Sequence, residues 1–544
     1  MIIPFAKPGT SSPAQATPSR PRSFFEKSAA LIIAVCFCGI IFFSLDDYGV
    51  TWDEGVYFHA GRSYFRWLKE PSLGNIDSYW AINHEHPPAL KLLAGLTHYL
   101  FHEKLKIFNN ISSYRLPILV FVFFSIYFIF LFASELFGLK IALITGACFF
   151  FLPRVFFYSH LGVMDYAVTS LWLMVIYAYW KGMENPKWIF VSAILLGFAL
   201  LTKINAWLIY IPLLFYWILR HSGHWKATFQ GKARLVSRDG ILLFSKLVPL
   251  IVIPPIIFVV LWPWLWKETL ERIFLYLAFH RHHPFVYVYY LGTQTPLAPW
   301  HYPWVLTLIT VPLVTLIPFI IGWIRIIVCP NRTNVFLLFN ALFPLLLISL
   351  PSVPKYDGER LFLPAFPFIC LIAGMGIQQI SLWAKKFQGE KIFYLLYACL
   401  LIWTLYSSVI KIHPYQSSYF NEVIGGVDGA VQKGFEPEYW GNAYIGVLEL
   451  MNKHPENKYW IYMADVEPKI LWGWKLYKED ELLGKSIQFG DKNNSDYLIL
   501  LIRPGFFDEE MWHHYKYKDP VFSVKLSNTP LVNVYDLKEF RAKR

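Results

Sequence analysis

Long apolar runs, repeated along most of the chain, constrain its fold more than any single motif does. The hydrocarbon core of a membrane is ~30 Å thick, which an α-helix of about 20 apolar residues can span. Runs of this kind recur between residues 28 and 410. Charged residues make up only 16% of the 544 residues, against about 25% in an ordinary soluble domain. The sequence therefore predicts an α-helical polytopic membrane protein.

Hydropathy divides these runs into about eleven helical spans. The spans are predicted at residues 28–45, 113–137, 139–154, 160–180, 188–203, 205–220, 245–266, 302–328, 334–351, 361–383 and 391–410. Together they form a predicted transmembrane domain over residues 28–410. The apolar segments show no internal repeat, whereas secondary transporters commonly contain one.

Basic residues set the predicted orientation of these spans. The polar tail, residues 1–27, contains Lys7, Arg20, Arg22 and Lys27, and its composition is typical of disorder. Lys and Arg are enriched in cytoplasmic loops, and every second loop after the tail is again basic. We therefore predict a multi-pass protein of the inner (plasma) membrane with a cytoplasmic N-terminus. The net charge of +12 is then a topology signal, and no nucleic acid is expected as a partner.

Four regions fall on the outer, periplasmic side in this topology, at residues 46–112, 267–300, 351–360 and 411–544. The first contains two amphipathic stretches, 54–68 and 88–103, which are typical of helices that lie in the membrane interface. The last region is more polar, and its segments KYWIYMADV, DYLILLIRPG and PLVNVYDL have the pattern of strands. We predict that it forms a small soluble α/β domain.

Two adjacent carboxylates, Asp53 and Glu54 of TWDEGVY, follow the first apolar run. Ionisable groups at a membrane are costly to keep there and indicate a functional site. A carboxylate just outside the bilayer can act as general base on an acceptor hydroxyl. Acidic residues are also favoured at helix N-termini, so the pair could instead begin the interfacial helix. The two roles are compatible, and Asp53 is the better catalytic candidate of the two.

Histidine and glutamate gather in two of the outer regions. The segment HEHPP contains Glu85 and His86. Carboxylate and imidazole groups suit divalent cations, and His86 is also a candidate contact for a phosphate. The candidate metal ligands are Glu85, His280, His282 and His283. The alternative interpretation is a solvated loop that ends at a Pro-Pro helix start.

Cations on the outer side would neutralise a phosphate. Lys203 lies at the outer end of a span, and Lys355 and Arg360 flank Tyr356 in the segment KYDGER. Outer Lys and Arg run against the positive-inside bias, although a cation can also extend from a helix end for topological reasons alone. Fixed cations stabilise charge that develops on a phosphate oxygen. Asp165, at the outer start of a span, could orient these cations or a substrate.

Six segments follow one another in the order TWDEGVY, EHPPALKLL, SYRLP, HLGVMDYAVTSLW, LLTKINAW and KYDGERLFLPAFP. This series resembles the polyprenyl-phosphate-dependent membrane glycosyltransferases, which include the protein O-mannosyltransferases (glycosyltransferase family 39) and the lipid A aminoarabinose transferases. The resemblance implies a GT-C architecture whose first outer loop carries a catalytic aspartate, here Asp53 with Glu54 beside it. It also maps Lys203 and Asp165 onto family positions. Residues 85–88 read Glu-His-Pro-Pro where the aminoarabinose transferases have Glu-Lys-Pro-Pro.

These features together predict an inverting glycosyltransferase. It would move a sugar from a polyprenyl-phosphate donor to a hydroxyl of a protein, lipid or glycan, with Asp53 as the base. The activated donor makes a nucleotide unnecessary, and the sequence has no Gly-rich nucleotide loop. A divalent metal is compatible with the Glu and His candidates. The alternatives are a transporter or flippase of lipid-linked intermediates and a glycan polymerase or ligase. Charges at the outer ends of the spans, rather than at mid-membrane, favour surface chemistry over transport.

Overall fold

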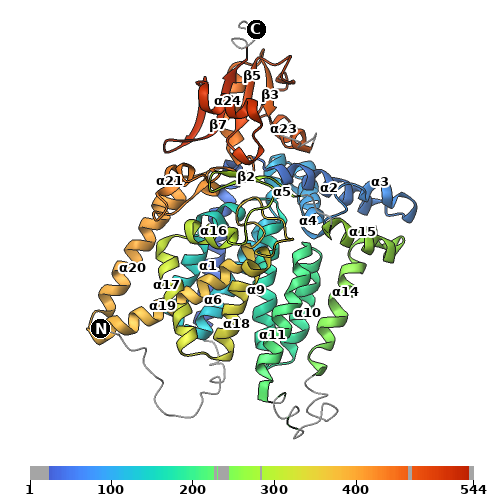
Figure 1. Ribbon diagram of the computed structural model, residues 1–544. Coiled ribbons are helices and arrows are strands. Elements are labelled where there is room, and N and C mark those ends of the chain that lie inside the picture. Colours follow the sequence, from blue (N-terminus) through green and yellow to red (C-terminus); the bar gives the residue numbers. More distant parts are fainter. Residues whose placement is uncertain are drawn as a thin grey trace.

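The structure, a computed structural model, describes residues 24–223, 225, 230, 244–281, 285–462 and 469–537. It consists of a bundle of helices with a smaller, sheet-containing part at one end (Figure 1). That end of the bundle is called the upper end below, as it is drawn in Figure 1. The polar tail before residue 24, most of the basic segment at 224–243, and His282 and His283 lie outside the described residues.

Each predicted span contains at least one helix of the bundle. The helices are α1 (Phe24–Phe43), α6 (Ile118–Phe137), α7 (Leu139–Phe150), α9 (Met164–Gly182), α10 (Lys187–Leu200), α11 (Tyr210–Arg220), α14 (Val248–Val260), α16 (Tyr302–Thr310), α17 (Leu313–Val328), α18 (Arg332–Ile348), α19 (Phe366–Lys386) and α20 (Glu390–Leu405). Among the described residues, four helical segments are long and apolar enough to cross a membrane, at 24–47, 118–137, 363–386 and 390–410. The prediction of a multi-pass helical membrane protein is confirmed, while the number of spans stays a prediction.

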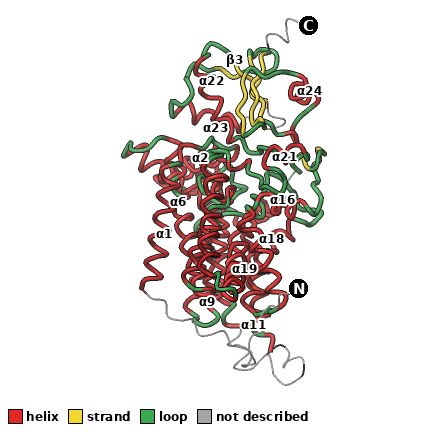
Figure 2. Tube along the Cα trace, turned by 90° about the vertical axis from the view of Figure 1, so that its left-hand side faces the viewer, coloured by secondary structure: helices red, strands yellow, loops and turns green. Residues whose placement is uncertain are grey.

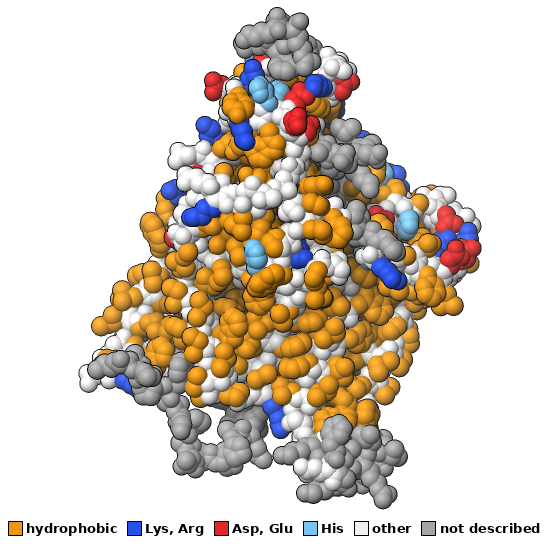
Figure 3. Space-filling model, viewed as in Figure 1, with side chains coloured by type: hydrophobic (Ala, Val, Ile, Leu, Met, Phe, Trp, Pro, Cys, Tyr) orange, Lys and Arg blue, Asp and Glu red, His pale blue; other side chains and the backbone are white. Residues whose placement is uncertain are grey.

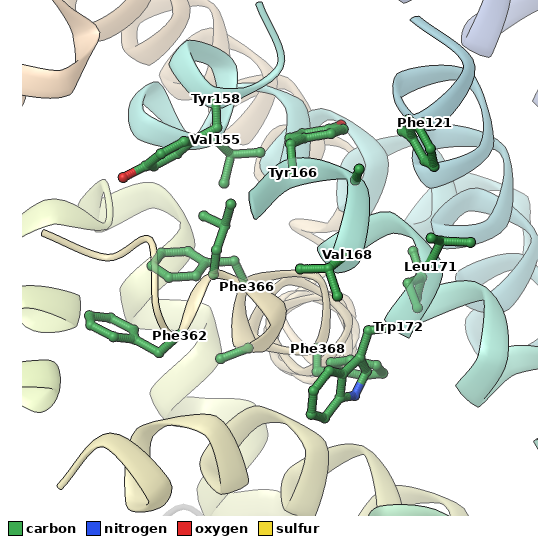
Figure 4. Packing of buried hydrophobic residues seen from close by; sticks show 14 of the residues in the cluster. Phe121, Val155, Tyr158, Tyr166, Val168, Leu171, Trp172, Phe362, Phe366 and Phe368 are labelled. Carbon is green, nitrogen blue, oxygen red and sulfur yellow. The ribbon is translucent and has the colours of Figure 1, made fainter. Parts of the chain in front are cut away.

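Helices α9 and α19 lie at the centre of the bundle and are buried on nearly all sides. A helix that is apolar all round belongs inside a large core or a membrane. Figure 4 shows how aromatic and aliphatic side chains such as Tyr166, Trp172 and Phe368 fill the space around these helices. In Figure 3 hydrophobic side chains cover the visible face of the bundle, whereas charged groups gather on the upper end and the sheet part. This face of the bundle is therefore suited to lipid.

Small residues let α17 and α19 approach each other closely. A Cβ built on Gly376 of α19 would overlap the backbone oxygen of Pro318 in α17. A Cβ on Gly322 of α17 would likewise overlap the backbone oxygen of Ile372. Close backbone approach at small residues is the usual packing device of membrane helices, because lipid provides no hydrophobic force between them.

Short helices lie across the upper end of the bundle (Figure 1). They are α2 (Trp52–Lys69), α3 (Ile76–Trp80), α4 (Ala89–Thr97), α5 (Asn110–Arg115) and α15 (Thr269–Arg281). A further short helix, α8 (Pro153–Tyr158), connects α7 to α9. Both predicted amphipathic stretches are helical, since α2 covers the first, and α4 with a π-helix at His98–Lys104 covers the second. The helices α2 and α4 meet at Gly61 and Gly95, where an added Cβ would overlap the backbone of the other helix.

The sheet part contains five strands in the order β4-β3-β5-β7-β6. Their bounds are Gln488–Phe489 (β4), Lys458–Tyr462 (β3), Tyr497–Leu501 (β5), Thr529–Asp536 (β7) and Phe522–Leu526 (β6). Strand β3 is parallel to β4 and β5, whereas β7 is antiparallel to β5 and β6. Helix α23 (Lys469–Glu479) follows β3 in the connection that parallel strands require, and α22 (Leu448–Lys453) and α24 (Glu509–Tyr517) accompany the sheet. The prediction of a small C-terminal sheet domain is confirmed.

Residues 413–441 pack against the helical bundle rather than within the sheet. The side chain of Asn421 donates to the backbone oxygens of Leu308 (2.7 Å) and Val311 (2.9 Å), at the end of α16. The backbone oxygen of Trp440 accepts from the N–H of Trp52 at 3.2 Å. The predicted domain boundary at residue 411 thus lies just before a polar segment. This segment forms hydrogen bonds with backbone groups at helix ends that have no partner within their own helix.

The sheet part docks on α2 and α5 through α23 (Figure 2). A Cβ on Gly55 of α2 would lie 2.7 Å from the backbone nitrogen of Gly473, so the two helices touch at paired glycines. The Asp480 carboxylate accepts from the backbone N–H groups of Asn110 (2.7 Å) and Ile111 (2.8 Å) and so satisfies free donors at the start of α5. Helix α2, which carries Asp53, therefore packs against α4 on one side and against α23 of the sheet part on another.

We expect Gly376→Ala to weaken the bundle, because the new methyl group forces α17 and α19 apart at a cost of about 1–3 kcal/mol. The matched control is Gly39→Ala in α1, where an added Cβ meets no atom within 4 Å. The thermal midpoint of detergent-solubilised protein should fall for Gly376→Ala and stay the same or rise for Gly39→Ala. Equal midpoints for the two variants would show that close packing at Gly376 does not support the fold.

Candidate active site

A buried arginine, Arg360, contacts three carboxylates from separate parts of the chain. Its Nη2 donates to Asp53 Oδ2 of α2 at 2.6 Å, and its Nη1 donates to Asp357 Oδ2 of the same loop at 2.7 Å. Its Nε lies 3.5 Å from Asp165 Oδ1 at the start of α9. The guanidinium also lies 4.6 Å from the ring centre of Trp440. One side chain thus joins an upper helix, a loop and a bundle helix.

A second cation, Lys203, completes the cluster. It lies between α10 and a 3-10 helix at Ile204–Ile209, and its Nζ donates to Asp165 Oδ1 at 2.5 Å. The structure therefore brings together Asp53, Asp165, Lys203 and Arg360, four of the residues predicted from the sequence. Their positions along the chain differ by up to 307 residues, which shows that the fold, not local sequence, builds this cluster.

The charges of the cluster balance when Arg503, from the sheet part, is included. Its Nη2 donates to Asp357 Oδ1 at 2.8 Å. Three carboxylates, those of Asp53, Asp165 and Asp357, then face three cations, so the formal net charge is zero. Buried charges are tolerated only when they are paired and hydrogen-bonded, and this balance is what allows the cluster to exist away from water.

Asp53 is the accessible carboxylate of the cluster. Its side chain is 29% exposed, whereas those of Asp165 and Asp357 are 1% and 7% exposed. Burial raises the pKa of Asp53, while the neighbouring Arg360 guanidinium lowers it. The three carboxylates raise the pKa of Arg360 well above its usual value and keep it charged, against the opposing effect of burial. Tyr57, one turn further along α2, donates its hydroxyl to Asp53 Oδ2 at 3.4 Å.

Glu54 points elsewhere and is fully buried. Both of its oxygens accept from Arg115 at 2.8 Å, one also accepts from the N–H of Gly162 at 2.8 Å, and the other from the N–H of Thr51 at 3.0 Å. The contact with Thr51 is half of a capping box at the start of α2. We therefore assign Glu54 to positioning α2, the helix-start role that the sequence also offered, and not to the reaction.

Lys91 holds the HEHPP segment in place, and we did not single it out from the sequence. Its buried Nζ donates to the backbone oxygens of Asn83 (2.6 Å) and His86 (2.8 Å). Burial lowers the pKa of Lys91 to about 7, although Glu85 acts in the opposite direction. A lone lysine inside the apolar stretch ALKLLAGL was the available sequence signal, because such a side chain needs partners when it is buried.

The candidate metal ligands are only partly brought together. His280 Nε2 lies 3.0 Å from the backbone oxygen of Glu85, whose side chain accepts from Asn83 Nδ2 at 3.0 Å. The ring centres of His86 and His280 are 5.5 Å apart, and the buried Nδ1 of His86 has no hydrogen-bond partner among the described residues. Within the described residues, no three His, Cys, Asp or Glu side chains form a group that could hold a metal ion. A metal site therefore stays a prediction.

The other cation of KYDGER, Lys355, forms hydrogen bonds with the backbone of its own loop. Its Nζ donates to the backbone oxygens of Leu350 (2.9 Å) and Val353 (3.0 Å). The ring centre of Tyr356 lies 5.7 Å from the Arg360 guanidinium, so Tyr356 borders the cluster. These two contacts shape the loop that carries Asp357 and Arg360, and neither of them involves a residue of the cluster.

Comparisons with known proteins give one family match and several similar solved structures. A family model described as dolichyl-phosphate-mannose-protein mannosyltransferase matches residues 85–248, a stretch that contains Asp165 and Lys203. ArnT from Cupriavidus metallidurans bound to undecaprenyl phosphate is 14% identical, with a TM-score of 0.51 over 93% of this chain and 98% of that chain. The predicted resemblance is confirmed. The likeness to ArnT shows the fold, and the family match is confined to residues 85–248.

Further solved structures have lower scores. The apo form of the same ArnT is 15% identical, covers 93% of this chain and 97% of that chain, and has a TM-score of 0.49. The archaeal oligosaccharyltransferase AglB from Archaeoglobus fulgidus, in complex with an inhibitory peptide and a dolichol-phosphate, is 11% identical. It covers 88% of this chain and 70% of that chain, with a TM-score of 0.47. A comparison with curated proteins finds no match.

The neighbouring carboxylates Asp53 and Glu54 should respond differently to the loss of charge. Glu54→Gln leaves Arg115 buried without a counter-charge, which typically costs about 3–5 kcal/mol. Asp53→Asn alters a partly exposed group and leaves Arg360 with the carboxylates of Asp165 and Asp357, so folding should stay intact. We expect Glu54→Gln to reduce the membrane level and thermal midpoint of the protein, and Asp53→Asn to preserve both. A Glu54→Gln protein that is as stable as wild type would refute the structural role of Glu54.

Proposed function

We propose that the protein is an inverting glycosyltransferase that moves a sugar from a polyprenyl-phosphate donor to an acceptor hydroxyl. The observation that carries the proposal is the cluster itself, in which a partly exposed carboxylate, Asp53, pairs with the buried cation Arg360. A second buried cation, Lys203, pairs with Asp165, which also lies beside Arg360. A base and fixed positive charges are what such a transfer needs at its two ends. The family match over residues 85–248 and the fold shared with ArnT support the same reaction class.

In this reaction Asp53 takes the proton of the acceptor hydroxyl while that oxygen attacks the anomeric carbon of the donor. The bond between the anomeric carbon and the phosphate oxygen breaks, and its electron pair stays on the lipid phosphate. Attack on the face opposite the leaving group inverts the anomeric configuration. Arg360 and Lys203 would stabilise the negative charge on the phosphate, which is the role that preorganised cations perform best in a site shielded from water.

The ion pair between Arg360 and Asp53 gives the donor a second role. In the resting cluster, Arg360 lowers the pKa of Asp53 against the effect of burial. A donor phosphate that draws Arg360 toward itself removes part of this influence, so the pKa of Asp53 rises and the carboxylate becomes a better base. Binding of the donor and activation of the acceptor are thereby linked through one guanidinium.

The reaction would take place at the periplasmic face of the inner membrane. In the proposed topology about eleven spans cross the membrane, the N-terminus is cytoplasmic, and residues 411–544 are periplasmic. The lipid tail of the donor would lie between spans, with its phosphate at the upper end of the bundle. The energy of the activated donor makes a nucleotide unnecessary. The described residues do not complete a metal site around Glu85, so no step is assigned to a metal.

We expect Asp53→Asn to lower sugar transfer by about 10²–10⁴-fold, the usual contribution of a positioned general base. Transfer is measured in membranes, which supply their own acceptors, with a panel of radiolabelled polyprenyl-phosphate sugars. The control is Glu70→Gln, which removes an exposed carboxylate at the other end of α2. Unchanged turnover in Asp53→Asn would exclude Asp53 as the base.

The product of the same assay separates the proposed function from its alternatives. A transporter or flippase would return a chemically unchanged lipid-linked substrate. A polymerase or ligase would add a whole oligosaccharide, which mass spectrometry detects as a large increase in acceptor mass. The proposed transferase adds a single sugar.

Arg360→Lys keeps the positive charge but loses the planar fork that reaches Asp53 and Asp357 together. We expect the KM for the polyprenyl-phosphate sugar to rise about tenfold, the effect of ~1.4 kcal/mol of lost binding. Arg66→Lys, an exposed change on α2, is the matched control. If Arg360→Lys has the KM of the wild type, the assignment of Arg360 to the donor phosphate fails.

A further inference from the structure

Arg503 reaches from the sheet part into the cluster. It lies two residues after β5, and its side chain is 2% exposed. The guanidinium lies 3.9 Å from the ring centre of Phe506 and 4.8 Å from that of Trp52. It donates to the backbone oxygen of Tyr439 at 2.5 Å and to Asp357 Oδ1 at 2.8 Å. A strand end, the 413–441 segment, α2 and the KYDGER loop therefore meet at one side chain.

Asp357 is shared between two arginines. One oxygen accepts from Arg503 and the other from Arg360, so the carboxylate fixes the distance between the two guanidinium groups. Asp357 has a φ of 53° and is followed by Gly358 at a φ of 62°. A left-handed conformation is unfavourable for a residue with a side chain and persists only when its surroundings impose it. Here the contacts of Asp357 with the two arginines supply part of that constraint.

We infer that Arg503 is a positioning residue for the proposed transfer: it holds Asp357 so that Arg360 stays directed at Asp53 and the donor phosphate. The sheet part is then a component of the active site rather than a separate module. This inference rests on the proposed function, because it assigns the group that Arg503 orients to that reaction.

The charge balance indicates what the loss of Arg503 would do. Without it, three carboxylates face two cations, and the cluster gains one net negative charge. Asp357 would then attract Arg360 more strongly, and the negative cluster would repel an anionic phosphate. In a buried site such effects are screened less than at the surface. Removing the Asp357 charge as well should restore the balance.

The first test measures binding of undecaprenyl phosphate to the full-length protein in nanodiscs by intrinsic tryptophan fluorescence. We expect Arg503→Met to bind the probe about tenfold more weakly, equivalent to ~1.4 kcal/mol. The double variant Arg503→Met/Asp357→Asn should recover affinity, which a purely structural defect would not do. Arg503→Lys should be intermediate, because it restores the charge without the fork. The matched control is Arg62→Met, which removes another arginine between α2 and the sheet part, 3.4 Å from Glu479.

Arg503→Met with wild-type affinity, or a double variant that is no better than the single one, would overturn the inference. A loss of affinity in Arg62→Met as large as in Arg503→Met would also overturn it, since docking of the sheet part would then explain both. Wild-type protein that fails to bind undecaprenyl phosphate would count against the proposed donor class, and a second measurement then decides the role of Arg503.

That measurement needs no ligand. A hydrophobic carbodiimide labels protonated carboxyl groups, and mass spectrometry follows the labelling of Asp53 as a function of pH. The titratable groups that face Asp53 are Tyr57, Asp165, Lys203, Tyr356, Asp357 and Arg360. If Arg503→Met draws Arg360 toward Asp357, the labelling midpoint of Asp53 shifts to higher pH, while Arg62→Met leaves it unchanged. An unshifted midpoint in Arg503→Met would refute the positioning role whatever the donor is.

Discussion

The site depends on one buried guanidinium. Arg360 contacts carboxylates from α2, from the start of α9 and from its own loop, so each of these parts needs the others for charge neutrality. A buried arginine without its carboxylates would cost several kcal/mol, and the same holds for the carboxylates without it. The cluster therefore ties the upper helices to the bundle. The geometry of the cluster follows from the need to pair every buried charge within it.

A second buried pair, Arg115 with Glu54, supports the first from another face of α2. Arg115 also donates to the backbone oxygens of Leu45, Tyr48 and Gly49, and so fixes the path of the chain into α2. With the start of α2 held in this way, Asp53 is directed to Arg360. Docking of α23 on Gly55 constrains the next turn. Rigid support of this kind is what keeps a catalytic group within the narrow geometry that a reaction needs.

The sequence predicted the architecture of the protein better than the composition of its site. Long apolar runs predicted the helices, and short apolar segments separated by turn-rich polar ones predicted β3, β5 and β7, because burial is repeated along each element. The sequence ranked Asp53 above Glu54 as the base but could not assign their partners, because neighbours on a helix point about 100° apart and only tertiary contacts show that Glu54 faces Arg115. Nothing in the sequence indicated that Arg503 belongs to the site, because it lies at the end of the apolar segment DYLILLIRPG, which was interpreted only as a strand. Its partner Asp357 lies 146 residues away, a separation that no local pattern reveals.

Neutrality of the resting cluster has a consequence for the proposed reaction. Buried cations without counter-charges would attract a phosphate most strongly, but burying them unpaired would cost the most folding free energy. Carboxylates therefore pair with the cations until the donor phosphate arrives. Asp165 and Asp357 are too enclosed to leave, whereas Asp53 is 29% exposed and borders solvent. The carboxylate that a phosphate can displace most readily is thus the one that must act as base. The ion pair between Asp53 and Arg360 therefore both stabilises the folded cluster and links donor binding to activation of the base.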